Sequence, residues 1–408
     1  MICGLLGRRL GHSYSPRIHG QLGNYEYRLF EKEPEDLEAF LRGGSFRGIN
    51  VTLPYKKSVI PFLDALSDVA ERLGAVNTIV RREDGTLIGH NSDYFGFRSM
   101  VERSGLWVSG KKVLVLGSGG ASNTAVAVMR ELGARVVVIS RTGEDNYGNL
   151  LRHADAAVIV NTTPVGMYPD VEASPVSLDG FPALEGVLDV VYNPARTALL
   201  MDAERRGLVA MNGLWMLVAQ AKESAEWFTG TEIPDSQIGR IYGMLKAQME
   251  NIVLIGMPGC GKSTVARALA ERLGREAVDA DLQIQRTAGM TIPQIFSEVG
   301  EDGFRKVESK VLAELGKQSG LVIATGGGCV TRPENYDALH RNGRIFWLTR
   351  SLERLPTDGR PLSQAGKLEQ MYEVRRPMYE RFADVTVDND GSLERTVAQI
   401  LKALEEQV

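Results

Sequence analysis

NIVLIGMPGCGKSTVARALAERLG, residues 251–274, is the stretch of this chain that most strongly decides its fold. It begins with a short β-branched run, passes through a glycine-rich turn and continues with apolar residues at helical spacing. The turn has the phosphate-binding pattern GxxxxGK followed by Ser or Thr, placed between a strand and a helix. Glycines let successive backbone N–H groups face phosphate oxygens, and the helix N-terminus adds a favourable potential. We therefore expect Lys262 to reach the outer phosphates of ATP and Ser263 to bind Mg²⁺. The candidate ATP-binding residues of the loop are Gly256, Met257, Pro258, Gly259, Cys260, Gly261, Lys262, Ser263 and Thr264.

A second strand–turn–helix unit, KKVLVLGSGGASNTAVAVMRELG, occupies residues 111–133. Its turn carries the first two glycines of the dinucleotide fingerprint, although alone it fits a plain strand-to-helix connection about as well. The next apolar run ends in Ser140–Arg141–Thr142, where an NAD site would place an acid for the ribose 2′-hydroxyl. Because a guanidinium suits a 2′-phosphate instead, this position favours NADP(H). The candidate cofactor-binding residues here are Gly117, Ser118, Gly119, Gly120, Ala121, Ser140, Arg141 and Thr142.

Both units open series of alternating strands and helices, which predicts α/β architecture with parallel sheets. A separate α/β segment precedes the first unit, and a helical stretch from Leu214 to Met249 leads directly into the strand at Asn251. No Pro/Gly/Ser-rich linker intervenes, so we place a stiff boundary near residue 249. We expect an N-terminal part, 1–248, with an α/β substrate lobe (1–106 and 213–248) and a Rossmann-like NADP lobe (107–212), followed by a P-loop domain, 249–408.

Composition excludes several classes of protein. The 408 residues include 47 basic and 51 acidic side chains, a net charge of −4, so the basic excess of a nucleic-acid binder is absent. No window holds the roughly 18 consecutive apolar residues that span a bilayer. The three cysteines lie far apart, which argues against a disulfide framework or a cysteine zinc site. We expect a cytoplasmic enzyme that acts on small molecules, without nucleic-acid or membrane partners.

The C-terminal part resembles the shikimate kinase family. The resemblance rests on VDAD at 278–281, GFRKVE at 303–308, IATGGGC at 323–329, DGRPL at 358–362 and RRPMY at 375–379. We expect Asp279 and Asp281 at the C-terminal end of the second strand, on the same side of that strand. The resemblance implies that Asp279 assists Mg²⁺ with Ser263, that Asp281 holds and deprotonates the reacting hydroxyl, and that Arg360 in a lid meets the phosphoryl group. It also implies a substrate cage of Asp281, Arg305, Gly327, Gly328 and Arg375, whose arginines clamp a carboxylate.

The N-terminal part resembles the shikimate dehydrogenase family. The motifs are GHSYSP at 11–16, GINVTLPYKK at 48–57, GAVNTI at 74–79, GHNSDYFG at 89–96, NTTPVGM at 161–167, DVVYNP at 189–194 and GLWMLVAQA at 213–221. The resemblance implies hydride transfer to a ketone, with Lys56 as general acid/base and Asp93 as its paired carboxylate. Adjacent Lys57 is expected to be an ordinary surface lysine. The implied substrate-binding residues are Ser13, Ser15, Asn50, Thr52, Lys56, Asn77, Asp93, Tyr192 and Gln220, with Asn161, Thr162 and Gly213 on the cofactor side.

Together the two resemblances imply a fused enzyme of aromatic amino acid biosynthesis. It would reduce 3-dehydroshikimate with NADPH and phosphorylate the resulting shikimate with Mg-ATP. The segment 143–160 is short for the family and places Glu144 and Asp145 near Arg141, which weakens the NADP preference. Two alternatives remain: a quinate/shikimate dehydrogenase joined to the kinase, and a chain in which one half is a non-catalytic ligand-binding module. The oligomeric state stays open.

Overall fold

The computed structural model describes residues 1–11, 13–355 and 365–406. The chain divides into two compact units, Met1–Asn193 with Thr197–Met244 and Pro194–Arg196 with Leu245–Val408. Each unit has its own sheets and its own hydrophobic core. Within the described ranges, no helix combines the length and the apolar character that crossing a bilayer requires.

The first lobe of the N-terminal unit is built on a mixed sheet of order β2-β1-β3-β5-β6-β4. Strand β5 runs antiparallel to both β3 and β6, and the other neighbours pair in parallel. The strands are β1 (Ile2–Gly7), β2 (Glu26–Glu31), β3 (Gly48–Val51), β4 (Ala65–Leu66), β5 (Thr78–Arg81) and β6 (Leu87–His90). The helices of this lobe are α1 (Ser15–Leu22), α2 (Leu37–Gly43) and α3 (Asp68–Leu73).

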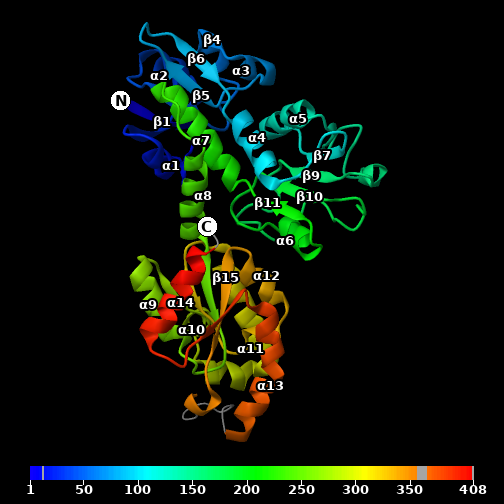
Figure 1. Ribbon diagram of the computed structural model, residues 1–408, viewed down its shortest axis with the longest axis vertical. Coiled ribbons are helices and arrows are strands. Elements are labelled where there is room, and N and C mark those ends of the chain that lie inside the picture. Colours follow the sequence, from blue (N-terminus) through cyan, green and yellow to red (C-terminus); the bar gives the residue numbers. More distant parts are fainter. Residues whose placement is uncertain (12, 356–364, 407–408) are drawn as a thin grey trace. The chain divides into compact units, whose positions relative to one another are not determined.

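The second lobe is a parallel sheet of order β11-β10-β9-β7-β8, as the strand–turn–helix unit predicts. Successive side chains of β7 alternate between two cores: Val113 and Val115 pack with α4 and α5, whereas Leu114 and Leu116 pack with α6. The helices consequently cover opposite faces of the sheet (Figure 1). The elements are β7 (Lys112–Leu116), β8 (Arg135–Ile139), β9 (Val158–Asn161), β10 (Gly186–Asp189), β11 (Val209–Met211), α4 (Asp93–Ser104), α5 (Gly120–Glu131) and α6 (Ala198–Arg205).

The helical stretch expected over 214–249 consists of two helices. Helix α7 (Leu214–Thr229) ends at Gly230, whose φ of 68° is left-handed, and α8 (Ser236–Met249) begins after Pro234. A left-handed glycine followed by a proline is a strong helix stop, because neither continues the backbone hydrogen bonding. Helix α7 packs against α1 and α4 of its own unit and thereby carries polar residues into the first lobe.

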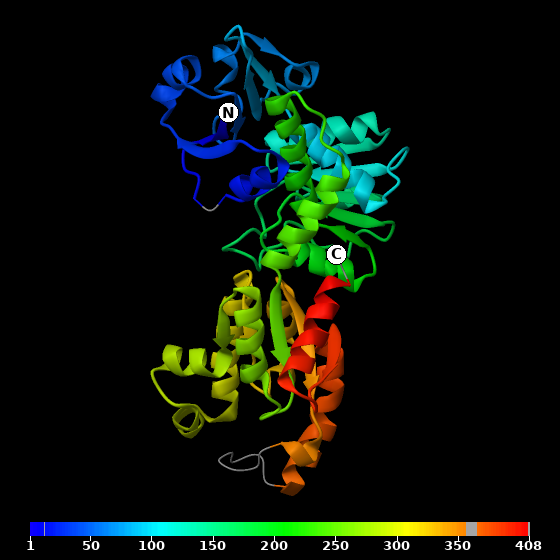
Figure 2. The ribbon, with the colours of Figure 1, turned by 60° about the vertical axis from the view of Figure 1, so that its left-hand side comes forward.

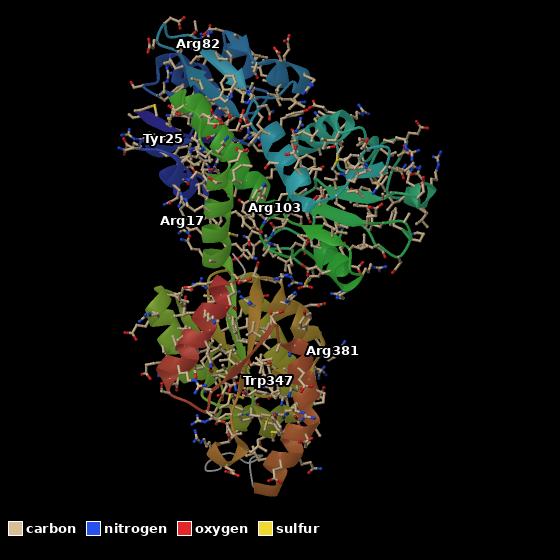
Figure 3. The ribbon with its side chains drawn as sticks, viewed as in Figure 1. Arg17, Tyr25, Arg82, Arg103, Trp347 and Arg381 are labelled. Carbon is tan, nitrogen blue, oxygen red and sulfur yellow. The ribbon has the colours of Figure 1, made fainter. Side chains whose placement is uncertain are left out.

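The C-terminal unit has a parallel sheet of order β13-β14-β12-β15-β16. Helices α9 and α14 contact each other, whereas α12 and α13 both contact β15; Figure 2 shows this unit from a second side. Trp347 of β15, labelled in Figure 3, stacks on Tyr379 in the core of this unit. The elements are β12 (Asn251–Ile255), β13 (Ala277–Asp279), β14 (Val322–Ala324), β15 (Gly343–Thr349), β16 (Val385–Asp388), α9 (Lys262–Leu273), α10 (Ala280–Ala288), α11 (Ile292–Lys317, with a kink at Gly300), α12 (Glu334–His340), α13 (Ala365–Phe382) and α14 (Leu393–Glu405).

Asp281 is not on the second strand of this sheet, contrary to expectation. Strand β13 ends at Asp279, and Asp281 lies in the first turn of α10. The carboxylate of Asp279 accepts hydrogen bonds from the backbone N–H groups of Asp281, at 3.0 Å, and Leu282, at 3.4 Å. Because Asp279 is the N-cap, α10 begins directly after β13. The Asp279 carboxylate is therefore held at the end of the strand, and the Asp281 carboxylate is held by the first turn of the helix.

Candidate active sites

Lys56 and Asp93 form an ion pair in the N-terminal unit. Lys56 lies in the turn after β3, and Asp93 is the first residue of α4. The Nζ of Lys56 lies 2.6 Å from Oδ2 of Asp93, and both side chains are mostly shielded from solvent. The ion pair therefore lies at the N-terminus of α4.

A buried network of polar side chains fixes this pair. Asn77 donates from Nδ2 to the other oxygen of Asp93, Oδ1, at 2.8 Å. The backbone N–H of Ser92 donates to Oδ1 of Asn77 at 2.8 Å, so the orientation of the Asn77 amide is set. The Ser92 hydroxyl lies 2.9 Å from that of Ser224 on α7. Helix α7 therefore closes the network from the other side.

The same network reaches the other predicted substrate residues. Asn50 donates to the Ser224 hydroxyl at 2.7 Å and accepts from the Tyr27 hydroxyl at 2.8 Å. Burial raises the pKa of Tyr27 well above its ordinary value, and a hydrogen bond with the Ser15 side chain opposes this. Ser15, Asn50, Asn77, Asp93 and Lys56 are thus linked through a continuous set of polar contacts.

The remaining predicted substrate residues lie around this network. Ser13 accepts from the backbone N–H of Ser15 at 3.2 Å. Gln220 accepts from the Ser92 hydroxyl at 3.4 Å. Tyr192 packs edge-on against Tyr14, with ring centroids 6.1 Å apart, and burial raises its pKa. Thr52 directly follows β3, between Asn50 and Lys56, and is half-buried.

The glycine-rich turn of the second lobe is open where a dinucleotide would bind. Gly117 has a φ of 110°, and α5 begins at Gly120 with Gly119 as its N-cap. Added side chains at Gly119 and Gly120 would meet nothing, whereas the buried Ser122 hydroxyl donates to the Gly117 carbonyl at 2.7 Å. Free backbone N–H groups at an open helix N-terminus fit the pyrophosphate of a dinucleotide. Ser118 is exposed and Ala121 is half-buried beside the turn.

Ser140, Arg141 and Thr142 follow β8 at the same end of the sheet as the glycine-rich turn. The connection that follows has a 3-10 helix (Leu150–His153) in place of a longer helix. Its Asp145 contacts His153 at 2.8 Å, while Arg141 is exposed. One acidic group near Arg141 is therefore engaged by a histidine of the same loop.

The cofactor-side residues from NTTPVGM and GLWMLVAQA are closely packed. Thr162 donates from its hydroxyl to the Leu116 carbonyl at 2.6 Å, beside the glycine-rich turn. The side chain of Asn161 is fully buried. A Cβ on Gly213 would lie 2.1 Å from the Val190 carbonyl oxygen, so the start of α7 passes β10 at a distance that only glycine allows.

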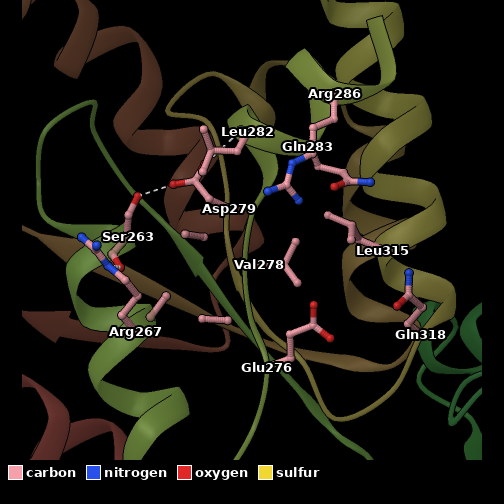
Figure 4. A pocket seen from close by; sticks show the side chains of 13 residues that line it. Ser263, Arg267, Glu276, Val278, Asp279, Leu282, Gln283, Arg286, Leu315 and Gln318 are labelled. Carbon is pink, nitrogen blue, oxygen red and sulfur yellow. Dashed lines mark hydrogen bonds between the residues drawn. The ribbon is translucent and has the colours of Figure 1, made fainter. Parts of the chain in front are cut away.

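The phosphate-binding loop of the C-terminal unit lies between β12 and α9. Lys262 is buried and donates from Nζ to the carbonyls of Gly256, at 2.9 Å, and Met257, at 3.0 Å. The Ser263 hydroxyl donates to Oδ2 of Asp279 at 2.6 Å, which Figure 4 shows as a dashed line at the rim of a neighbouring pocket. The loop also borders a cavity, which is lined by Lys262 together with Pro258, Gly259, Gly261 and Thr264. The side chains of Met257 and Cys260 are buried behind the loop.

A cavity of about 750 Å³ brings the predicted kinase residues together. It is lined by Lys262, Ser263, Asp279, Asp281, Arg305, Gly327, Gly328 and Arg375, among others. Arg375 donates to the Gly327 carbonyl at 3.1 Å. A Cβ on Gly328 would lie 2.2 Å from the Arg305 guanidinium, so a larger residue would displace that arginine. Arg360 lies outside the described residues.

The sequence analysis missed several residues that hold these sites. Glu308 is fully buried and accepts from Nη1 of Arg305 at 2.7 Å, and its burial raises its pKa while Arg305 lowers it. Tyr379 donates to the Gly327 carbonyl at 2.5 Å. In the N-terminal unit, Ser224 and Tyr27 complete the polar network. Glu308 is the last residue of GFRKVE, and Tyr379 is the last residue of RRPMY. Their place in these motifs was the signal that could have identified them as site residues.

The fold and the two sites define a dinucleotide-dependent oxidoreductase joined to a P-loop kinase. A model of the shikimate dehydrogenase substrate binding domain matches residues 5–79, and a model of shikimate kinase matches residues 258–405. A shikimate dehydrogenase (NADP(+)) of Clostridium perfringens strain SM101 is 36% identical over 267 residues, which cover 60% of this chain and 98% of that protein. The chain belongs to the shikimate dehydrogenase family and also carries a shikimate kinase domain.

Solved structures agree with the fold of the N-terminal unit. Shikimate dehydrogenase 1 from Peptoclostridium difficile is 38% identical with a TM-score of 0.54, covering 60% of this chain and 97% of that one. The enzyme of Thermus thermophilus, solved in complex with NADP(H) and shikimate, is 31% identical with a TM-score of 0.54, covering 59% of this chain and 98% of that one. The predicted α/β class with Rossmann-like and P-loop domains is confirmed.

Proposed function

We propose that this chain catalyses two consecutive reactions of the shikimate pathway. Residues 1–248 would reduce 3-dehydroshikimate to shikimate with NADPH, and residues 249–408 would phosphorylate shikimate with ATP to shikimate 3-phosphate. The observation that carries the proposal is the pairing of Lys56 with Asp93 in one unit and the cavity that joins Lys262 to Arg305 and Arg375 in the other. Each of these sites belongs to a unit whose own family model matches.

In the dehydrogenase site, Lys56 and Asp93 would handle the proton. NADPH supplies the hydride when it is bound. The ammonium of Lys56 would donate a proton to the carbonyl oxygen as negative charge develops on it. Asp93, fixed by Asn77, would hold the Lys56 ammonium at that oxygen. The hydroxyl and amide groups of Ser13, Ser15, Asn50, Thr52 and Gln220 would bind the substrate's hydroxyls and carboxylate.

In the kinase site, arginines would bind the substrate and a carboxylate would orient its reacting hydroxyl. Arg305 and Arg375 are both nearly buried and would clamp the shikimate carboxylate. Asp281 would accept the proton of the attacking hydroxyl, and Lys262 would bind the outer phosphates.

The Ser263 hydroxyl and the Asp279 carboxylate would hold Mg²⁺. They lie 2.6 Å apart, and both offer oxygen ligands, which this hard cation prefers. Within the described ranges no group of three or more His, Cys, Asp or Glu side chains is arranged to hold a metal by itself. A Mg²⁺ ion at Ser263 would therefore depend on phosphate oxygens and water for its remaining ligands, as is usual for this ion.

We also propose a cytoplasmic location and small molecules as the ligands. Cys3, Cys260 and Cys329 are free and buried, as is usual in a reducing compartment.

The test follows both reactions at once in the full-length chain. Purified protein is mixed with 3-dehydroshikimate, NADPH, ATP and Mg²⁺, while NADPH absorbance and product mass are recorded. We expect NADPH consumption to match the formation of shikimate 3-phosphate, and EDTA to stop only the phosphorylation. No NADPH loss would overturn the dehydrogenase assignment, and a reaction that stops at shikimate would overturn the kinase assignment. Parallel reactions with NADH, or with quinate and NAD⁺, test the alternative of a quinate/shikimate dehydrogenase.

A further inference from the structure

Asp189 is a fully buried carboxyl group at the C-terminal end of β10. Its Oδ1 accepts from Nδ2 of Asn161, at 3.0 Å, and from the backbone N–H of Val191, at 3.0 Å. Its Oδ2 accepts from the Thr197 hydroxyl at 2.8 Å. Asn161 and Val191 are N–H donors that need an acceptor at Oδ1, whereas the Thr197 hydroxyl beside Oδ2 can donate or accept.

The contact with Asp189 fixes which way the Asn161 amide faces. Because the NH₂ group faces Asp189, the amide oxygen faces Thr163. That oxygen accepts from the Thr163 backbone N–H at 3.0 Å and from its hydroxyl at 2.7 Å. The direction of the amide therefore determines the shape of the turn that follows β9.

This turn is the surface against which the glycine-rich loop packs. A Cβ added to Gly117 would lie 2.9 Å from the Thr162 hydroxyl oxygen and 3.1 Å from the Thr163 methyl carbon. The Thr162 hydroxyl also donates to the Leu116 carbonyl at 2.6 Å. The turn after β9 therefore lies directly against Gly117, the first residue of the loop, with no room for a side chain between them.

We propose that Asp189 is a positioning residue for the dinucleotide site: it orients Asn161, which holds the Thr162–Thr163 turn against the glycine-rich loop. Asp189 itself does not touch the cofactor, because its side chain is fully buried and satisfied by its three hydrogen-bond partners. Its effect is on the shape of the loop that receives the pyrophosphate. The proposal rests on the proposed dehydrogenase function of this unit.

The test compares Asp189→Leu with Asp155→Leu in the full-length chain. Asp155 belongs to the same lobe, but it is exposed and pairs with Lys112 at the surface. The dissociation constant of NADPH is measured at pH 8 from NADPH fluorescence, without substrate, alongside kcat and both Michaelis constants. Leucine at 189 has about the size of aspartate but offers no acceptor to Asn161 and Val191, so we expect NADPH to bind about tenfold more weakly or worse. The value of kcat at saturating NADPH and the KM for shikimate should stay within about twofold.

A second variant separates positioning from a general loss of structure. Asp189→Asn keeps an amide oxygen that can accept from Asn161 and Val191, with its NH₂ group facing the Thr197 hydroxyl, and we expect it to retain most of the NADPH affinity. Circular dichroism and the melting temperature of the full chain report whether each variant folds, because the kinase unit has a core of its own. The inference is overturned if Asp189→Leu binds NADPH as Asp155→Leu does, or if Asp189→Asn loses as much NADPH affinity as Asp189→Leu. An unmodified chain that binds no NADPH would instead overturn the proposed dehydrogenase function, and this inference with it.

Discussion

The Nζ of Lys56 lies 2.6 Å from Oδ2 of Asp93, although one residue lies in a turn after β3 and the other begins α4. The second oxygen of Asp93 is held by Asn77. With both of its oxygens engaged, Asp93 has little freedom to rotate, and the ammonium group is fixed with it. Fixed geometry of this kind is what proton transfer to a substrate oxygen needs.

Replacing Lys56 should remove dehydrogenase activity and leave the kinase intact. For Lys56→Ala we expect kcat for NADPH oxidation to fall by about 10²–10⁴, the usual contribution of a general acid. Lys57→Ala is the matched control, because this neighbouring lysine is exposed. The fall in NADPH absorbance measures the activity of both variants, and circular dichroism of the full chain verifies that they fold. A loss of less than tenfold in Lys56→Ala would contradict the assigned role.

Two arginines on the same helix should respond differently to the same change. Arg375 lines the kinase cavity and is nearly buried, whereas Arg381, also on α13 and labelled in Figure 3, is exposed. Lysine cannot form the paired hydrogen bonds of a guanidinium with a carboxylate. We therefore expect Arg375→Lys to raise the KM for shikimate in the kinase reaction about tenfold or more. Arg381→Lys should leave the same KM unchanged. Equal KM values for the two variants would remove Arg375 from the substrate site.

Arg141 should decide the choice between NADPH and NADH. Its exposed guanidinium follows β8, at the end of the sheet where α5 begins. We expect Arg141→Ala to raise the KM for NADPH by about tenfold and to leave the KM for NADH unchanged, since only NADPH carries a 2′-phosphate. Arg135→Ala, at the opposite end of β8, serves as the control. If the KM values for NADPH and NADH rise equally in Arg141→Ala, Arg141 does not bind the 2′-phosphate.

The buried carboxyl of Asp189 should give the protein a stability that declines with rising pH. Burial raises the pKa of Asp189 from 3.8 to about 7, and its hydrogen-bond partners Asn161, Val191 and Thr197 are neutral groups. Between pH 3.8 and about pH 7, Asp189 keeps its proton in the folded protein, whereas in the unfolded chain the same carboxyl group has lost it. The contribution of Asp189 is therefore complete below pH 3.8 and is lost as pH rises to about 7, at up to about 1.4 kcal/mol per pH unit.

Denaturant unfolding of the full chain at several pH values measures this effect. The free energy of unfolding of the unmodified protein, minus that of Asp189→Asn, should fall between pH 4 and 7. Asp155→Asn should show no such fall, because Lys112 lowers the pKa of the exposed Asp155. A difference that stays constant with pH would mean that Asp189 is ionised throughout this range.

Local sequence patterns predicted the elements around both sites and failed where contacts came from distant segments. The turns before α5 and α9 need backbone conformations that few residues other than glycine adopt. Their glycine motifs therefore predicted both turns from the sequence. The sequence also carries the signal for the break between α7 and α8, Gly230 followed by Pro234, although the expected helical stretch was not divided there. The partnership of Ser224 with Asn50 was beyond reach, since a serine on a helix gives no signal of what it faces.

The sequence by itself determined the α/β class, the family resemblances and the order of the two units, because these depend on short-range spacing of apolar residues and glycines. Tertiary structure alone decided how Asp189 meets Asn161 and how Glu308 neutralises Arg305 inside the kinase cavity. Such pairs exist because buried polar groups must be satisfied, and the chain meets that requirement through whichever side chains folding brings together. The spacing of residues along the chain therefore does not predict which buried polar side chains will pair.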